Sequence, residues 1–200
     1  FDDALIAFTN AISLESRYAE AWFGKACALI EIKRFNDALV AIDVALTLNP
    51  VDLDALINKA VILINLGKHQ VALDILDEIN LSAPNISTVL SNRGAALEGL
   101  ARYHEAIASY EAASRLEPEF SDANSNLQNA RYSLACLNLK EFNFSVGWTE
   151  YEARWTSKGN SSTPVISSRP DWLGGASSNP LYVWAEQGIG DQILYASMFH

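Results

Sequence analysis

Small and apolar residues recur every 34 positions along the first 120 residues of the chain. Alanine forms one such column, at positions 4, 38, 72 and 106, and proline forms another, at positions 50, 84 and 118. A third column holds Trp22, Leu56 and Leu90, and each of these is followed seven residues later by leucine. Several columns that keep one period predict a series of stacked structural units rather than one irregular core.

Within residues 53–86 the apolar positions recur at the helical spacing of 3.6 residues, first before and then after Gly67. Gly67 lies where a turn can use a residue without a Cβ atom, and Pro84 lies where a second helix must end. Ser87 and Ser121 can cap the helices that follow. The sequence therefore predicts two antiparallel helices per unit, with the alanine column at their closest approach. The predicted inner faces are Leu56, Ala60 and Leu63 in the first helix and Ala72, Leu73, Leu76 and Ile79 in the second.

The 34-residue period and its residue types resemble the tetratricopeptide repeat, whose unit is a pair of antiparallel helices. The resemblance covers residues 1–155. It implies an all-α fold, the right-handed superhelix of helix pairs called an α-solenoid, with a concave face that suits a protein or an extended peptide. The expected divisions are a half repeat at 1–16, full repeats at 19–52, 53–86 and 87–120, and an irregular, extended repeat at 121–155.

The last repeat departs from the period, because its aromatic residues at 142 and 144 come five or seven positions late. Seven residues are about two helical turns, so the apolar stripe returns to nearly the same face. We therefore expect a first helix, at residues 123–139, that is longer than its predecessors. A second helix is expected at 144–155, with Trp148 and Trp155 buried at a junction with the segment that follows.

The composition narrows the classes of function. Half of the 200 residues are hydrophobic and the formal net charge is −10, which is globular composition and argues against nucleic acids or anionic membranes as partners. No apolar run approaches the roughly 20 residues that cross a bilayer. Cys27 and Cys136 are too few for a disulfide framework or a metal set. We therefore expect a cytoplasmic protein without a metal site.

The character of the sequence changes after residue 155. Residues 156–180 are rich in Ser, Gly and Pro, which predicts a linker. Residues 181–200 predict a strand (LYVWA), a glycine loop (EQGIGD) and the start of a helix, the truncated opening of an α/β domain. The chain starts with Phe rather than Met, so we expect further protein at both ends.

The segments GWTEYEARW, PDWLGG and LYVWAEQGIGDQILYA, within residues 144–200, resemble the junction in bacterial proteins that fuse such repeats to a GT-B glycosyltransferase. The catalytic part of those proteins is similar to heptosyltransferases and, more distantly, to O-linked N-acetylglucosamine transferases. The resemblance implies that Gly188 and Gly190 form a ligand loop and that Asp191 is a catalytic base. It implies a nucleotide-sugar donor if the longer protein is a glycosyltransferase, and no other cofactor is expected. The alternative for Asp191 is that it caps its helix.

Three asparagines, Asn58, Asn92 and Asn126, lie 34 residues apart and are expected on the concave face of the first helices. An amide side chain both donates and accepts hydrogen bonds, so this asparagine column suits the backbone of an extended peptide. O-linked N-acetylglucosamine transferases resemble this arrangement in holding protein substrates with such a ladder. The alternative is that asparagine is a polar, exposed residue at this position without a binding role. Gly24 interrupts the column.

A basic column follows one position later, at Lys25, Lys59 and Arg93. In an acidic chain these cations either balance neighbouring Asp and Glu side chains or grip an acidic peptide terminus.

Two functions follow from the sequence. The first is an interaction scaffold that binds a protein or a peptide on its concave face, without chemistry of its own. The alternative is the substrate-recruiting arm of a glycosyltransferase whose catalytic domain begins at about residue 181. About 20 residues cannot form a complete catalytic domain. The sequence therefore leaves open whether the longer protein is an enzyme.

Overall fold

The computed structural model describes residues 2–151, which lie within one compact unit. All regular structure in this part of the chain is α-helical, as the all-α class requires. The linker at 156–180, the expected strand and glycine loop, and Trp155, Gly188, Gly190 and Asp191 lie outside the described residues. The helices are α1 (Asp2–Leu14), α2 (Ala19–Glu31), α3 (Phe35–Leu48), α4 (Leu53–Asn65), α5 (His69–Ser82), α6 (Ser87–Gly99), α7 (Tyr103–Leu116), α8 (Ser121–Lys140) and α9 (Phe144–Tyr151).

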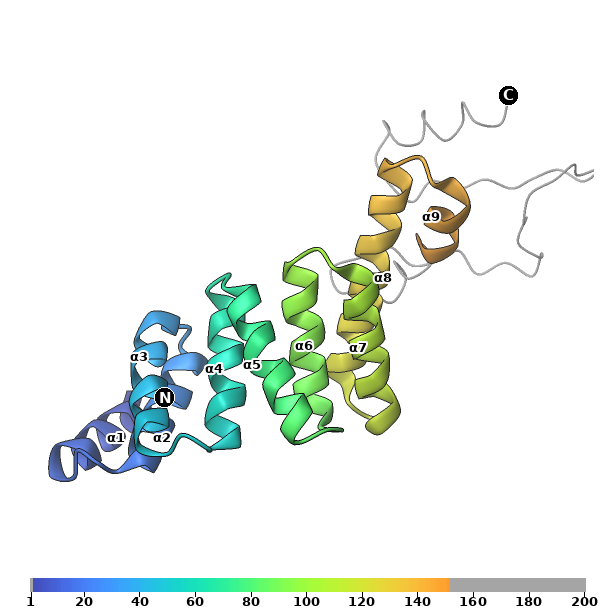
Figure 1. The fold of residues 1–200 in the computed structure, drawn as a ribbon. Helices are drawn as coiled ribbons and strands as arrows, with labels where there is room; N and C mark the ends of the chain where they lie inside the picture. Colours follow the sequence, from blue (N-terminus) through green and yellow to red (C-terminus); the bar gives the residue numbers. More distant parts are fainter. Residues whose placement is uncertain (1, 152–200) are drawn as a thin grey trace, which may run out of the picture. The chain divides into compact units, whose positions relative to one another are not determined.

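Each helix packs against the next in chain order, so neighbours in sequence are neighbours in space (Figure 1). The pairs α2–α3, α4–α5 and α6–α7 lie in the ranges expected for full repeats, and α1 lies in the half repeat. We call α2, α4, α6 and α8 the first helices and the others the second helices. Each first helix also contacts the first helix of the next pair. One side of the array is therefore built from first helices alone.

The alanine column marks the closest approach of helices, as the sequence predicts. Ala38, Ala72 and Ala106 have no exposed surface. A second column of small residues on the first helices holds Ala26 and Ala60, also fully buried, and then Gly94. A Cβ atom on Gly94 would lie 2.6 Å from the ring of Tyr110, so the glycine makes room for that side chain.

The apolar core runs continuously from pair to pair. Its buried residues form two clusters, one around α2 to α4 and one around α4 to α8, and Leu39 packs against both. The predicted inner faces of the unit 53–86 are confirmed, since all of their residues except the half-buried Leu56 are at most 3% exposed. A single pair could not cover these faces, so the stacking of neighbouring pairs builds the core.

The turns inside the pairs share one backbone feature. Lys33, Gly67 and Ala101 lie 34 residues apart, and each has a positive φ, of 59°, 73° and 58°. Gly67 therefore has the role that its sequence position predicts, because glycine adopts this region without a steric cost. At the other two positions the same turn forms with a side chain present.

The expected serine caps are wrong. Ile86 and Phe120 are the N-cap residues of α6 and α8, and neither provides a side-chain cap. Ser87 lies inside α6, where its hydroxyl donates to a Glu117 carboxylate oxygen at 2.6 Å. Among the described helix starts, a side-chain cap is found at α4, where an Asp52 carboxylate oxygen accepts from the Ala55 N–H at 3.1 Å.

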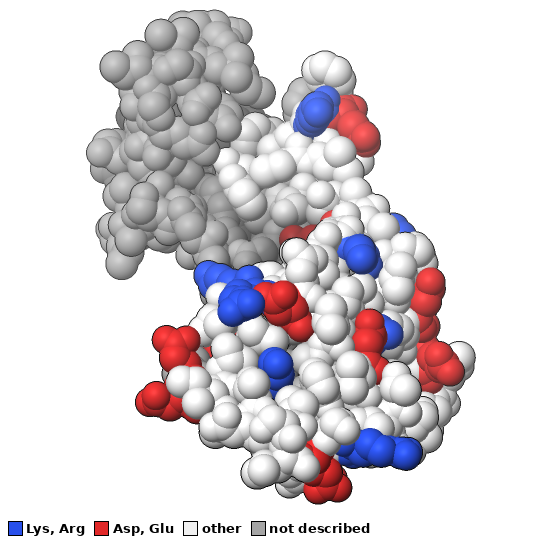
Figure 2. Space-filling view, turned by 90° about the vertical axis from the view of Figure 1, so that its left-hand side faces the viewer, with Lys and Arg blue, Asp and Glu red and all other residues white. Residues whose placement is uncertain are grey.

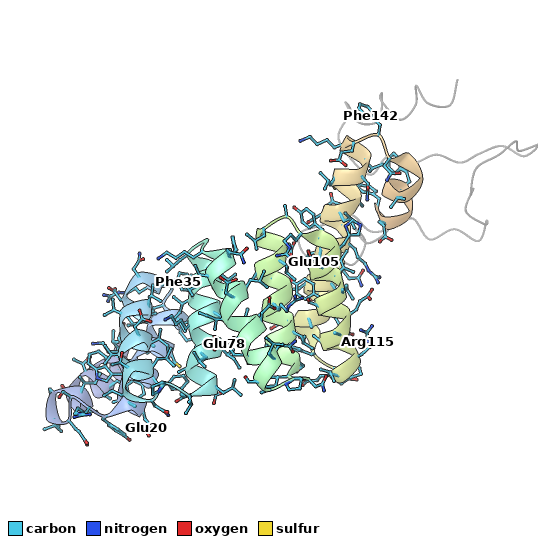
Figure 3. The ribbon with its side chains drawn as sticks, in the orientation of Figure 1. Glu20, Phe35, Glu78, Glu105, Arg115 and Phe142 are labelled. Carbon is cyan, nitrogen blue, oxygen red and sulfur yellow. The ribbon has the colours of Figure 1, made fainter. Side chains whose placement is uncertain are left out.

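The last pair differs from the others, as expected. α8 has 20 residues, whereas the preceding helices have 13 or 14. Tyr151 of α9 is buried and packs against Tyr132 of α8, with the ring centroids 5.5 Å apart and the rings tilted by 37°. Trp148 meets Tyr151 edge-on at 5.6 Å but keeps 36% of its surface exposed, so it is less buried than expected. Phe142, at the turn between α8 and α9, is largely exposed (Figure 3).

The end of the array at α1 is mostly uncharged. Figure 2 looks onto this end and shows Lys and Arg scattered beside Asp and Glu on a largely uncharged face. Leu5 and Phe8 of α1 are half-buried against α2. The large apolar side chains of α1 that are exposed are Ile6 and Leu14.

Replacing Ala72 with Leu should lower the free energy of unfolding by about 1–3 kcal/mol, because three extra carbons must enter a filled core. Ala4→Leu is the matched control, since Ala4 has the same place in the repeat but is exposed. It should change the free energy of unfolding by less than about 0.5 kcal/mol. Urea unfolding followed by far-UV circular dichroism measures both. Equal effects of the two substitutions would contradict the role of the alanine column.

Candidate ligand-binding surface

The asparagine column lies on the side where first helices adjoin. Asn58 is on α4 and half-buried, and its Nδ2 donates to the Sγ of Cys27 on α2 at 3.5 Å. Burial raises the pKa of the Cys27 thiol, which keeps it neutral. The amide of Asn58 therefore lies between two consecutive first helices.

Asn92 on α6 and Asn126 on α8 are also half-buried. The residues one repeat and two repeats after Cys27 are Val61 and Ala95, whose side chains cannot accept a hydrogen bond. Among the described residues, neither asparagine has a side-chain partner, and neither amide is closed off from solvent. Both amides therefore keep their full hydrogen-bonding capacity.

The gap in the asparagine column at Gly24 has a steric cause. A Cβ atom on Gly24 would collide with the ring of Phe8 on α1. The corresponding second-helix residues before Asn58 and Asn92 are the smaller Ile42 and Leu76, and the one before Asn126 is Tyr110, whose ring packs against Gly94 instead. The aromatic ring of α1 thus occupies the space that an asparagine side chain would need.

Two members of the basic column bind acids of the preceding repeat. Lys59 of α4 forms an ion pair with Asp43 of α3, with 2.8 Å between Nζ and Oδ1. Arg93 of α6 donates from Nε to Asp77 of α5 at 2.6 Å, and from Nη1 to the Ser109 hydroxyl of α7 at 2.6 Å. These contacts agree with the charge-balance interpretation of the column. A role in binding a peptide stays a prediction for Lys59 and Arg93.

Lys25, the first member of the basic column, differs from the others. It has no ion pair within residues 2–151, and its Nζ lies over the ring of Trp22, 5.4 Å from the centroid. Such a cation–π contact leaves the ammonium without a counter-charge.

The structure also contains an acidic column, which was not predicted from the sequence. Asp43, Asp77 and Glu111 lie 34 residues apart on successive second helices, and each binds a cation of the next first helix. Glu111 pairs with Arg131 at 2.7 Å, because the basic column ends at Leu127 and the arginine lies one turn later. The signal was present in the sequence as a shared period.

Tyr110 and Glu98 form a partly buried polar pair between α7 and α6. The Tyr110 hydroxyl donates to a Glu98 carboxylate oxygen at 3.2 Å. Burial raises the pKa of Glu98, although the Tyr110 hydrogen bond opposes this shift. Burial also raises the pKa of Tyr110 far above the physiological range, so its hydroxyl keeps its proton.

Other candidate chemistry gives no site in the described part of the chain. No three His, Cys, Asp or Glu side chains of residues 2–151 lie close enough to hold a metal ion. The ring of His69 packs over Gly99, and the residues 34 positions before and after His69 are the aromatic Phe35 and Tyr103. No described helix is both long and apolar enough to span a bilayer.

Comparison with protein families agrees with this arrangement. Two models of the tetratricopeptide repeat match the chain, one over residues 24–83 and one over residues 87–120. The chain contains tetratricopeptide repeats. A search for similar curated proteins found no match.

Several solved structures share the fold of this chain. MamA 41-end from Desulfovibrio magneticus RS-1 is 20% identical with a TM-score of 0.61, covering 76% of this chain and 80% of that one. The Arabidopsis OM64 TPR domain is 27% identical with a TM-score of 0.54, covering 57% and 95%. The first TPR of Spaghetti (RPAP3) bound to HSP90 peptide SRMEEVD is 23% identical with a TM-score of 0.54, covering 60% and 96%.

Glu98→Gln should raise the free energy of unfolding relative to the parent protein at about pH 7. At about pH 4 the difference in the free energy of unfolding should be smaller. The raised pKa of Glu98 means that its protonated form favours folding. That contribution is present below the unfolded-state pKa and is lost as the pH rises through the folded-state pKa. Glutamine stays neutral and still accepts from Tyr110. Urea unfolding at both pH values measures the difference.

Glu105→Gln is the control, and its effect on the free energy of unfolding should depend on pH in the opposite direction. Its hydrogen bond from Arg102 lowers the pKa of Glu105, so the charged form favours folding and the contribution is lost as the pH falls. Glu105 is solvent-exposed, so the effect is small. A Glu98→Gln stability difference that is the same at both pH values would contradict the assignment.

Proposed function

We propose that the tetratricopeptide repeats form a scaffold that binds an extended segment of a protein or peptide. The segment would lie along the face built by the first helices, which we expect to be the concave face of the superhelix. The observation that carries this proposal is the asparagine column, whose amides at Asn92 and Asn126 lie on adjoining helices with free hydrogen-bonding capacity. An extended backbone offers donors and acceptors that match amide groups.

The residues around the column indicate the chemistry of the ligand. Phe23, Ile30, Ile57 and Ile64 are only partly buried against the core, so the first two full repeats offer apolar surface. Further along, the corresponding positions include the partly exposed Glu98 and Ser125, whereas Ser91 is buried. The surface therefore favours a ligand with apolar side chains at one end and polar side chains at the other. The structure of Spaghetti (RPAP3), solved with an HSP90 peptide, supports the proposal that this fold holds peptides.

The glycosyltransferase alternative rests on the sequence resemblance alone. The family models match residues 24–83 and 87–120, within the repeats. Asp191, Gly188 and Gly190 lie outside the described residues, so their roles stay predictions. Under this alternative the repeats would recruit the acceptor protein, and the binding face would be the same.

Replacing Asn58, Asn92 and Asn126 together with Ala should weaken peptide binding by about tenfold or more, because three hydrogen bonds of about 0.5–1.5 kcal/mol each are lost. Peptides that bind the full chain are first selected from a displayed random-sequence library. Fluorescence anisotropy of a labelled, selected peptide then measures the dissociation constant.

The matched control replaces Asn10, Asn36 and Asn49 with Ala, since all three are exposed and lie outside the column. This variant should bind as the parent does. Circular dichroism shows whether both variants keep their helix content. Equal affinity of the parent and the column variant would leave the asparagines as polar surface residues. Failure to select any peptide would contradict the scaffold function itself.

A further inference from the structure

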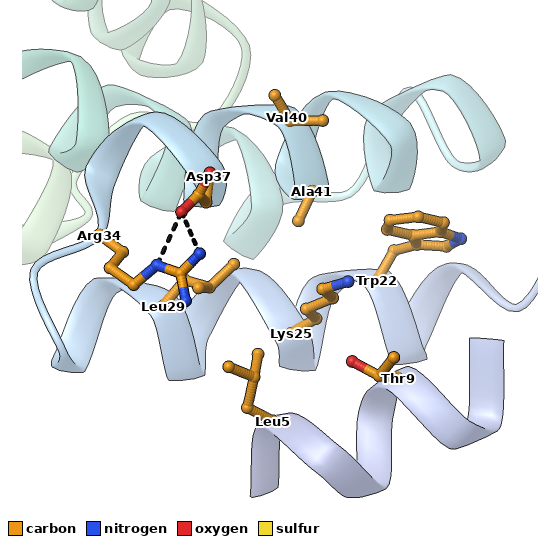
Figure 4. A pocket seen from close by; sticks show the side chains of 9 residues that line it. All are labelled: Leu5, Thr9, Trp22, Lys25, Leu29, Arg34, Asp37, Val40 and Ala41. Atoms are coloured by element: carbon orange, nitrogen blue, oxygen red, sulfur yellow. Dashed lines mark hydrogen bonds and ion pairs between the residues drawn. The ribbon is translucent and has the colours of Figure 1, made fainter. Parts of the chain in front are cut away.

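A pocket of about 310 Å³ lies between α1, α2 and α3 (Figure 4). Its walls are mainly apolar, with Leu5 on α1 and Val40 on α3 among them. Three side chains add other chemistry: the hydroxyl of Thr9, the ring of Trp22 and the ammonium of Lys25. The pocket is lined by residues of the second helices α1 and α3 together with α2, and no member of the asparagine column lines it.

The pocket lies where the acidic column is broken. In the next two repeats the second helix supplies an aspartate to the basic column, with Asp43 bound to Lys59 and Asp77 bound to Arg93. The residue 34 positions before Asp43 is Thr9, which carries no charge. Lys25 is therefore the member of the basic column whose carboxylate is missing.

The charges of the lining leave Lys25 uncompensated. Arg34 and Asp37 neutralise each other, with Nε and Oδ2 2.7 Å apart (Figure 4). Two cations and one acid line the pocket, so its lining carries one net positive charge in a chain of net charge −10. The Trp22 ring is held in place by a hydrogen bond of 2.9 Å from Nε1 to the Ser16 carbonyl, and it keeps the Lys25 ammonium at the pocket.

We propose that this pocket binds an Asp or Glu side chain of a partner polypeptide. Its carboxylate would take the place that Asp43 and Asp77 have in the next two repeats, accepting from Lys25 and from the Thr9 hydroxyl. An apolar neighbour of the acidic residue would pack on Leu5 and Val40. A carboxylate is the group that this repeat frame places beside the cation twice more, which favours it over other anions. The site is separate from the asparagine column and independent of the proposed function.

Nuclear magnetic resonance of the full chain tests the proposal. The indole N–H signal of Trp22, assigned with a Trp22→Phe variant, reports on the pocket. The probe is the blocked tripeptide acetyl-Leu-Asp-Leu-amide, and its neutral counterpart is acetyl-Leu-Asn-Leu-amide. We expect the aspartate peptide to shift the Trp22 signal with a dissociation constant on the order of 1 mM, as for a single solvent-screened ion pair with a small apolar contact. The asparagine peptide should bind at least about tenfold more weakly.

Two variants of one residue separate charge from shape. Thr9→Asp restores the acidic column, and its carboxylate should form an ion pair with Lys25. Binding of the aspartate peptide should therefore weaken at least about tenfold. Thr9→Asn places a side chain of the size of aspartate without its charge, and the asparagine Nδ2 can donate to the bound carboxylate in place of the Thr9 hydroxyl. It should therefore weaken binding of the aspartate peptide much less than Thr9→Asp does. Thr9 is exposed on α1, so both variants are expected to fold, and circular dichroism checks this.

Each of the following results would overturn the proposal. The first is a Trp22 signal that the aspartate peptide does not shift. The second is equal binding of the aspartate and asparagine peptides, or unchanged binding to the Thr9→Asp variant. The third is inorganic phosphate shifting the signal as strongly as the peptide at the same concentration, which would assign the pocket to free anions rather than to a polypeptide.

Discussion

The close approach of helices at a few small residues determines the rest of this structure. Where Ala38, Ala72 and Ala106 are fully buried, only a methyl group separates the two helices. Larger side chains at other positions then interdigitate and form one core from pair to pair. Because each pair covers the apolar face of its neighbour, the repeat positions that point outward are free to vary. The polar columns occupy such positions.

The features that the sequence predicts well are those that repeat and involve burial. The period placed the helix pairs, the alanine column and the glycine turn at Gly67, because each of these is a steric requirement that few residue types meet. The extended α8 was predictable for the same reason, since the apolar stripe must return to one face. Local propensity was less informative. Lys33 and Ala101 adopt the same left-handed turn as Gly67, and Ser87 does not cap its helix, because the stacked context decides these positions.

The candidate site could be predicted only in part, because polar side chains are positioned by partners from other repeats. The asparagine column was recognisable by its period, but the contact of Asn58 with Cys27 depends on how α2 and α4 pack. The basic column was also recognisable, yet its partners were not. Arg93 is bound by Asp77 of one helix and Ser109 of another, 16 residues away on either side. A period shared by an acidic and a basic column is the signal that predicts such pairing.

The contact between α1 and α2 lies where two polar columns are interrupted. Gly24 stands at a position of the asparagine column, and Thr9 stands at a position of the acidic column. The adjacent residues Phe8 and Thr9 stand where the next two repeats have an aliphatic residue and an aspartate, and they face Gly24 and Lys25. The ring of Phe8 fills the space left by Gly24, so the packing between the helices is kept. The ion pair is not replaced, and an exposed pair contributes only about 0–1 kcal/mol, so its loss costs the fold little. The packing of α1 on α2 therefore restricts which residues can stand at positions 8 and 24, whereas it does not restrict the residues at positions 9 and 25. Because the stability of the fold does not require an acid opposite Lys25, this cation can serve to bind a ligand.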